Sequence, residues 1–188
     1  MSEAAVLAVR RTQLMDDLRS EFEAHVVDRV SRYLEVEHQG IIANHHFAEA
    51  SAQLLDLYRD GYFLSAVMVS QAVAEGIWKL LLKKATLAPA KDRTGLIAEL
   101  VKATCISSET GEAFARVFRS ERNDYHHMNP PVASHPTSVF ARRNIHDIAT
   151  IERDVFGFTI DEGRIIPTRP KNWDMNPDGT VPVYLRLG

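Results

Sequence analysis

Residues 62–84, YFLSAVMVSQAVAEGIWKLLLKK, form the most hydrophobic segment of the chain. Placed on a helix, their apolar side chains cover most of the circumference, and such a helix belongs at the centre of a bundle. The few polar residues recur at helical spacing and form one seam: Gln71, Glu75, Lys79 and Lys83. This segment therefore predicts the central helix of an all-α bundle, with the seam facing solvent or, at Glu75, facing a site.

Helical periodicity continues on both sides of this segment. Residues 3–38 contain no Pro or Gly and repeat apolar side chains at spacings of three, four or seven, which predicts one long amphipathic helix ended by Gly40. Further helices are predicted at 44–59 with Asn44 as cap, at 94–104, after Ser107-Ser108, and from Thr137 or Ser138 to Gly157. The sequence thus predicts a bundle of five or six helices.

The composition changes after Gly157, where four of the eight prolines lie and alternation replaces helical spacing. Residues 158–166 are typical of a small hairpin, and Asn176-Pro177-Asp178-Gly179 predicts a turn. We therefore expect three parts. They are a long helix within 1–42 that packs on the bundle or on a dimer partner, a helical bundle at 43–157, and a Pro-rich extended or β tail at 158–188.

Composition and missing motifs exclude several classes of protein. No apolar run reaches the roughly 20 residues of a membrane helix, and residues 1–12 lack a secretory signal layout, so a cytoplasmic protein without membrane contact is expected. The net charge of −3 disfavours a protein that coats DNA through a broad basic surface. A phosphate-binding Gly-rich loop, a CxxC pair and HExxH are absent, so no cofactor is predicted.

A fixed cation precedes two adjacent imidazoles in Arg122-Asn123-Asp124-Tyr125-His126-His127, within a segment that is predicted to be helical up to Pro130. At roughly 100° per residue, Arg122 and His126 share a face, whereas His127 lies about 140° away. Loosening of the last turn before Pro130 would bring His127 back beside Arg122. A histidine near a helix C-terminus also favours its protonated form. Such residues can bind a phosphate and transfer protons. The alternative is that they lie at a helix end without forming a site.

Two more arginines extend this pattern, because Arg116, Arg119 and Arg122 recur at i, i+3 and i+6. They form a stripe in which Arg119 and Arg116, together with Glu75 from the central helix, are candidate substrate-binding residues. The alternative is a solvated face, since three acidic residues of the same segment balance the arginines: Glu112, Glu121 and Asp124.

The apolar helix pair from Phe47 to Leu82, followed by Arg122-Asn123-x-x-x-His127, resembles the HEPN superfamily. Members of that family share a helical bundle and often an R-x(4–6)-H motif. The resemblance spans roughly residues 44–155 and carries over to Arg122, to Asn123 as the polar residue that commonly follows the arginine, and to His127. The long N-terminal helix and the tail lie outside the common core.

The resemblance implies a metal-independent endoribonuclease of the toxin or defence-effector type, in which two protomers share one cleft. RNA supplies its own nucleophile in the 2′-hydroxyl, so proton transfer and charge stabilisation suffice. His127 would be the acid or base, with His126 as its competitor, Arg122 would hold the phosphorane charge, and Asn123 would orient one of them. The expected partners are RNA, a second copy of the chain, and an antitoxin or sensor protein.

Two other functions remain open on the sequence. The first is a non-catalytic HEPN-like interaction or nucleic-acid-binding module, in which Arg122 and His127 are structural. The second is a metal bundle, because Glu35-x-x-His38 and Asp124-x-x-His127 each place a carboxylate and an imidazole at i, i+3. Its companion carboxylates would be Glu75 and Glu112.

Overall fold

The computed structural model describes residues 2–87, 93–119 and 121–186, and the chain divides into two units, residues 1–35 and 36–188. The first unit is one helix, α1 (Glu3–Glu35). No residue of α1, which lies wholly in the described part of the chain, is buried, and its apolar stripe is exposed at Leu7, Leu14, Leu18, Phe22, Val30 and Tyr33. The helix ends at Glu35, earlier than predicted, and Val36 already belongs to the core of the second unit.

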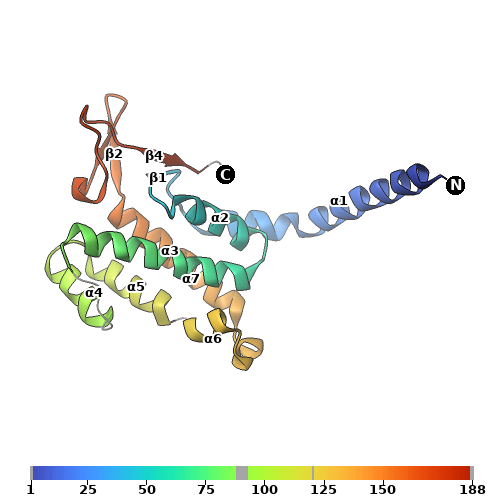
Figure 1. The fold of residues 1–188 in the computed structure, drawn as a ribbon, viewed down its shortest axis with the longest axis horizontal. Coiled ribbons are helices and arrows are strands. Elements are labelled where there is room, and N and C mark those ends of the chain that lie inside the picture. The colour runs from blue at the N-terminus through green and yellow to red at the C-terminus, as the bar shows by residue number, and fades with distance from the viewer. Residues whose placement is uncertain (1, 88–92, 120, 187–188) are drawn as a thin grey trace. The chain divides into compact units, whose positions relative to one another are not determined.

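The second unit is mostly helical, as predicted, and is built around α3 (Phe63–Lys84). Eleven of the 22 residues of α3 are buried. Packed on it are α2 (Ala48–Arg59), α5 (Ser108–Arg119) and α7 (Thr137–Val155), with α3 and α7 running side by side (Figure 1). Among the described residues, α3 is also the one helix that is long and apolar enough to cross a membrane. Its packing at the centre of the bundle accounts for that composition.

The remaining helices are short. They are α4 (Arg93–Lys102), α6 (Arg122–His127) and the 3-10 turns η1 (Pro130–Ser134) and η2 (Pro170–Asn172). The predicted cap of α5 is confirmed, because the Thr110 backbone N–H donates to Ser107 Oγ at 3.1 Å. The predicted cap at Asn44 is wrong. Its backbone N–H donates to the Pro182 carbonyl at 3.1 Å, so Asn44 continues a strand pairing and α2 begins four residues later.

The tail forms two pieces of antiparallel sheet. The predicted hairpin is confirmed as β2 (Phe158–Asp161) and β3 (Arg164–Pro167), with Asp161 opposite Arg164. The second pair was not predicted: β4 (Val183–Leu185) lies against β1 (Ile41–Ala43), with Tyr184 opposite Ile42. The end of the described chain is thereby attached to the segment that leads into α2.

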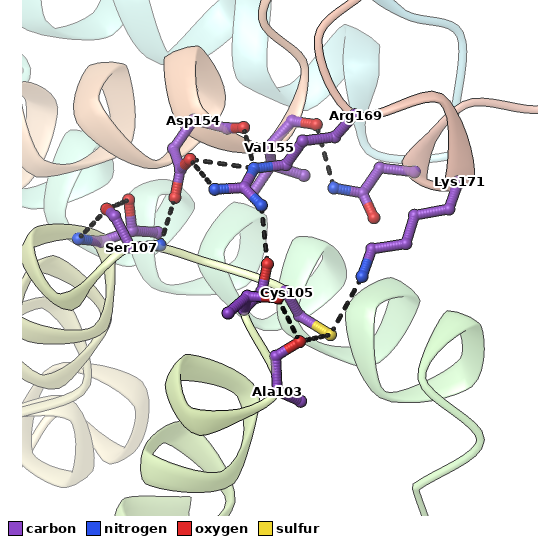
Figure 2. Close-up of polar contacts among 10 residues, drawn as sticks. Ala103, Cys105, Ser107, Asp154, Val155, Arg169 and Lys171 are labelled. Atoms are coloured by element: carbon purple, nitrogen blue, oxygen red, sulfur yellow. Dashed lines mark hydrogen bonds and ion pairs between the residues drawn. The ribbon is translucent and has the colours of Figure 1, made fainter.

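Arg169 fastens the tail to the helices (Figure 2). Its Nη2 lies 2.7 Å from Asp154 Oδ1 at the end of α7, and its Nη1 donates to the Thr104 carbonyl at 2.8 Å. The second oxygen of Asp154 accepts the Ser107 backbone N–H at 2.7 Å. One carboxylate therefore joins the tail, the start of α5 and the end of α7.

Candidate functional site

The four predicted catalytic residues line a single surface depression of about 580 Å³ in the second unit: Arg122, Asn123, His126 and His127. Arg119, predicted to bind substrate, lies in the same lining, which Arg93, Phe118, Glu121 and Asp124 complete. The structure therefore brings together the predicted motif and one arginine of the predicted stripe.

The helix that carries this motif is not continuous, contrary to the prediction. α5 ends at Arg119, Glu121 adopts a left-handed φ of 46°, and α6 begins at Arg122. In a continuous helix, Glu121 would lie four residues after the buried Val117 and would face the core. Burying an unpaired carboxylate is costly, and the break leaves Glu121 exposed. Arg122 consequently opens a short helix of its own.

Tyr125 sets the rotation of α6. Its side chain is fully buried, and its hydroxyl lies 3.0 Å from Thr137 Oγ1. At roughly 100° per residue, Asn123 and His127 then lie on the side of α6 opposite Tyr125, whereas Arg122 and His126 lie about 60° and 100° from it. α6 thus presents two i, i+4 pairs, Arg122 with His126 and Asn123 with His127.

The expected loosening of the last turn does not occur. The chain stays helical through His127 and leaves the helix only at Met128, whose φ is 49°. His127 therefore remains on the opposite side of α6 from Arg122, although both line the depression. Within this chain, His126 is the imidazole that shares the side of Arg122.

Glu75 holds the guanidinium of Arg122. Arg122 Nη2 donates to Glu75 Oε2 at 2.7 Å, and Lys79 Nζ lies 2.8 Å from Glu75 Oε1. The hydrogen bond from Lys79, followed by the charge of Arg122, lowers the pKa of Glu75 despite its partial burial. Glu75 therefore stays anionic and positions Arg122 from α3, and it is not part of the lining itself.

The arginines of the predicted stripe have two different roles. Arg116 forms a bidentate pair with the buried Asp147 of α7, with Nη2 to Oδ1 at 2.8 Å and Nε to Oδ2 at 3.2 Å. The hydrogen bonds that Arg116 donates to Asp147 raise the pKa of Arg116. Arg116 is not in the lining of the depression, and its contact joins α5 to α7. Arg119 is exposed and remains available to a ligand.

Asp124 fixes the chain that follows α6. Asn129 Nδ2 donates to Asp124 Oδ1 at 3.0 Å, and His135 Nε2 lies 3.0 Å from Asp124 Oδ2. These hydrogen bonds, that from Asn129 first, lower the pKa of Asp124. His135 contacts Asp124 without lining the depression, and the sequence reasoning missed it, since no spacing relates it to the motif.

The predicted set of metal ligands is not assembled. α1 ends at Glu35, so His38 does not lie one turn further along the same helix. Glu75 pairs with Arg122, Glu112 lies 3.7 Å from Arg116, and Asp124 is bonded to Asn129 and His135. Within the described ranges, one different group of potential ligands lies together: Glu121, Asp124 and His135.

Partial desolvation at the exposed His126 disfavours the imidazolium that the prediction favoured. Desolvation, followed by the charge of Arg122, lowers its pKa below the ordinary value of 6.5, and Glu75 offsets part of this shift. The expected stabilisation of an imidazolium by the helix C-terminus does not prevail, because α6 has only six residues and a cation lies nearby. A neutral imidazole at pH 7 suits a general base.

Arg93 lines the depression and was also missed by the sequence reasoning. Its guanidinium lies 4.9 Å from the centroid of Phe118 and 5.6 Å from that of Trp78, and its Nη2 is 3.6 Å from Glu75 Oε2. One signal could have marked it: Arg93 is the first residue of α4, where the helix dipole disfavours a cation. Packing against α3 and α5 compensates for that position.

Comparisons with protein-family models, with curated proteins and with solved structures each returned no match. The chemistry of the site therefore carries the functional argument. The depression combines a positioned guanidinium, two imidazoles and an amide, open to solvent. These groups can bind a phosphodiester and transfer protons at it.

Proposed function

We propose that this protein is an endoribonuclease that cleaves RNA by attack of the 2′-hydroxyl, without a metal ion in the chemical step. The observation that carries the proposal is the meeting of Arg122, Asn123, His126 and His127 in one depression, with Arg122 held by Glu75 at 2.7 Å. The resemblance of Arg122-Asn123-x-x-x-His127 to the HEPN motif supports the same function.

In the proposed mechanism, neutral His126 takes the proton of the 2′-hydroxyl as the oxygen attacks phosphorus. The bond from phosphorus to the 5′-oxygen breaks, and His127 donates a proton to that leaving oxygen. Arg122 stabilises the charge of the phosphorane, since a guanidinium binds two phosphate oxygens at once. Asn123 lies one turn before His127 and orients it. The products are a 2′,3′-cyclic phosphate and a 5′-hydroxyl.

We further propose that the active form is a homodimer, or a larger assembly of dimers, that acts as a toxin or defence effector under an antitoxin or sensor protein. A second protomer would add another guanidinium and another pair of imidazoles to the cleft, and two-fold pairing is the commonest closed arrangement of identical chains. Light scattering at micromolar concentration should give twice the mass of one chain. A monomer under those conditions would contradict the shared cleft.

The decisive experiment is cleavage of single-stranded RNA by the purified protein in EDTA. Arg122→Ala and His126→Ala should each lower the rate by a factor on the order of 10²–10⁴, as expected for loss of charge stabilisation or of a general base. The matched control is Arg164→Met, which removes an exposed positive charge on β3. It should leave the rate unchanged. DNA of the same sequence should resist cleavage, because it lacks the internal nucleophile.

His127→Ala distinguishes the two imidazoles. If His127→Ala abolishes cleavage and His126→Ala does not, Arg122 of one protomer acts with His127 of the other protomer, and not with His126 of its own α6. Rates that are unaffected by all three substitutions would rule out the nuclease.

One observation favours the second candidate, a non-catalytic interaction or nucleic-acid-binding module. Arg122 already forms an ion pair with Glu75, so it contributes to the packing of α6 on α3. For such a module, Arg122→Ala would lower the unfolding temperature and weaken RNA binding, and no cleavage would occur in any variant.

A further inference from the structure

Arg93 and Arg122 reach the same carboxylate from different parts of the chain. Arg122 Nη2 lies 2.7 Å and Arg93 Nη2 lies 3.6 Å from Glu75 Oε2, although Arg93 belongs to α4 and Arg122 to α6. Both guanidinium groups line the depression, and about a third of each side chain is exposed. The site therefore has two neighbouring cations of fixed position, one more than cleavage of a single phosphodiester requires.

The two arginines differ in what remains for a ligand. Arg122 is hydrogen bonded to Glu75, whereas 3.6 Å is beyond the usual range of a hydrogen bond for Arg93. Among the described residues, the Arg93 side chain has no hydrogen-bond partner. Its guanidinium is nonetheless held in place, because it lies over the ring of Phe118 and near that of Trp78. A guanidinium that is held in place and keeps its donors is suited to binding a phosphate.

We infer that Arg93 binds a second phosphate of the substrate, adjacent to the phosphate that Arg122 holds. This inference rests on the proposed function and extends it: the preferred substrate is a strand with at least one phosphate beside the scissile one. Arg119 on the rim adds positive charge along the same path. Glu75 keeps the two guanidinium groups close together while the site is empty, since like charges would otherwise repel.

Equilibrium binding of uncleavable ligands tests the inference independently of catalysis. The ligands are a 2′-deoxy dinucleoside monophosphate, which has one phosphate, and the same molecule with an added 3′-phosphate. The extra phosphate should tighten binding to the wild-type protein roughly tenfold, the gain expected from a charge-assisted hydrogen bond. In Arg93→Met this gain should disappear, so that the one-phosphate and two-phosphate ligands bind with equal affinity.

Two further variants keep the test decisive. Arg164→Met, on β3 outside the depression, should retain the tenfold gain. Arg93→Gln preserves a flat polar head over Phe118 without the charge, and it replaces Arg93→Met if circular dichroism shows that the latter is unfolded. A gain from the extra phosphate that is equal in wild type and in the Arg93 variants would overturn the inference.

Cleavage separates this inference from the proposed function. If the wild type cleaves neither the ribo-dinucleotide nor its 3′-phosphorylated form, yet binding shows the Arg93-dependent gain, the nuclease proposal fails and the second phosphate site stands. If RNA is cleaved and Arg93→Met slows both substrates equally, the nuclease stands and the second phosphate site fails.

Discussion

His126 and His127 are adjacent in the sequence, and the rotation of α6 gives them different surroundings. Tyr125 faces the core, so His126 lies toward Arg122 and Glu75 while His127 lies on the opposite side of the helix. Partial desolvation, followed by the charge of Arg122, lowers the pKa of the solvent-exposed His126 below its ordinary value of 6.5. Their one-residue offset along α6 therefore makes His126 the candidate base and His127 the candidate acid.

This difference predicts the acidic limb of the pH–rate profile. If His126 is the base, kcat/KM should rise with pH through a pKa below 6.5 and be level above it, because the neutral imidazole is the active form. His126→Ala should remove that limb along with most of the rate. The assignment would be wrong if the limb lay above pH 6.5, or if it persisted in His126→Ala at the same position.

His38 predicts a pH dependence of stability in the second unit. Burial first, and then the charges of Arg186, His146 and Arg153, lower its pKa from 6.5 to about 3. Between these values the unfolded chain binds a proton that the folded chain does not. Stability is therefore complete above pH 6.5 and falls toward pH 3, by about 1.4 kcal/mol per pH unit from this residue.

Urea unfolding at pH 7 and pH 5 measures this effect. His38→Phe, which cannot titrate, should lose roughly 2 kcal/mol less than the wild type on going from pH 7 to pH 5. Parallel losses in the two proteins would show that His38 titrates normally in the folded state.

At the scale of helices, Gly76 sets how closely α3 approaches the start of α2. A Cβ atom at this position would lie 2.9 Å from Phe47 Cδ1 and 3.2 Å from Phe47 Cβ, and the latter cannot move without its backbone. Gly76→Ala gains about 1 kcal/mol in helix propensity, but overpacking of a core costs about 1–3 kcal/mol. We expect a net loss of stability of up to about 2 kcal/mol.

Chemical denaturation checks this prediction, with Gly40→Ala as control because nothing lies within 4 Å of a Cβ there. Phe47→Leu should offset the loss caused by Gly76→Ala, since the smaller side chain removes the ring atom at 2.9 Å. Additive effects of the two substitutions would place the cost of Gly76→Ala elsewhere than at Phe47.

At the scale of the whole second unit, Arg186 attaches the end of the described chain to the bundle. Its Nη2 lies 2.6 Å from Glu152 Oε1 of α7 and 2.6 Å from Ser51 Oγ of α2. Ser51 also donates to Glu152. The Glu152 side chain is 1% exposed and that of Arg186 is 5% exposed. The charge of Glu152 is therefore tolerated only while the tail is docked.

Arg186→Met should lower the free energy of unfolding by about 3–5 kcal/mol, because it leaves a buried carboxylate without its counter-ion. Arg164→Met removes an exposed arginine from the same tail and should change stability by less than about 0.5 kcal/mol. The double substitution Arg186→Met with Glu152→Met should recover most of the loss. Equal effects of Arg186→Met and Arg164→Met would show that the tail does not stabilise the bundle.

Features that depend on a few neighbouring residues were determined by the sequence itself. The apolar circumference of residues 62–84 predicts the buried central helix, Ser107 caps α5, and the Asp161-Glu162-Gly163 turn closes the β2–β3 hairpin. The motif residues also meet by local geometry, since Arg122 and His127 belong to one six-residue helix. Periodicity and turn chemistry act over such short distances, so they can be read without the fold.

Contacts between distant residues were decided only by the tertiary structure. Arg93 and Glu75 join Arg122 because α3, α4 and α6 pack together, and β4 pairs with β1 from the opposite end of the second unit. The break at Glu121 belongs to this class as well, because its cause is the core that a continuous helix would have forced a carboxylate to face. Such positions follow from which surfaces are buried and which charges need partners. Both depend on the whole bundle rather than on any local pattern.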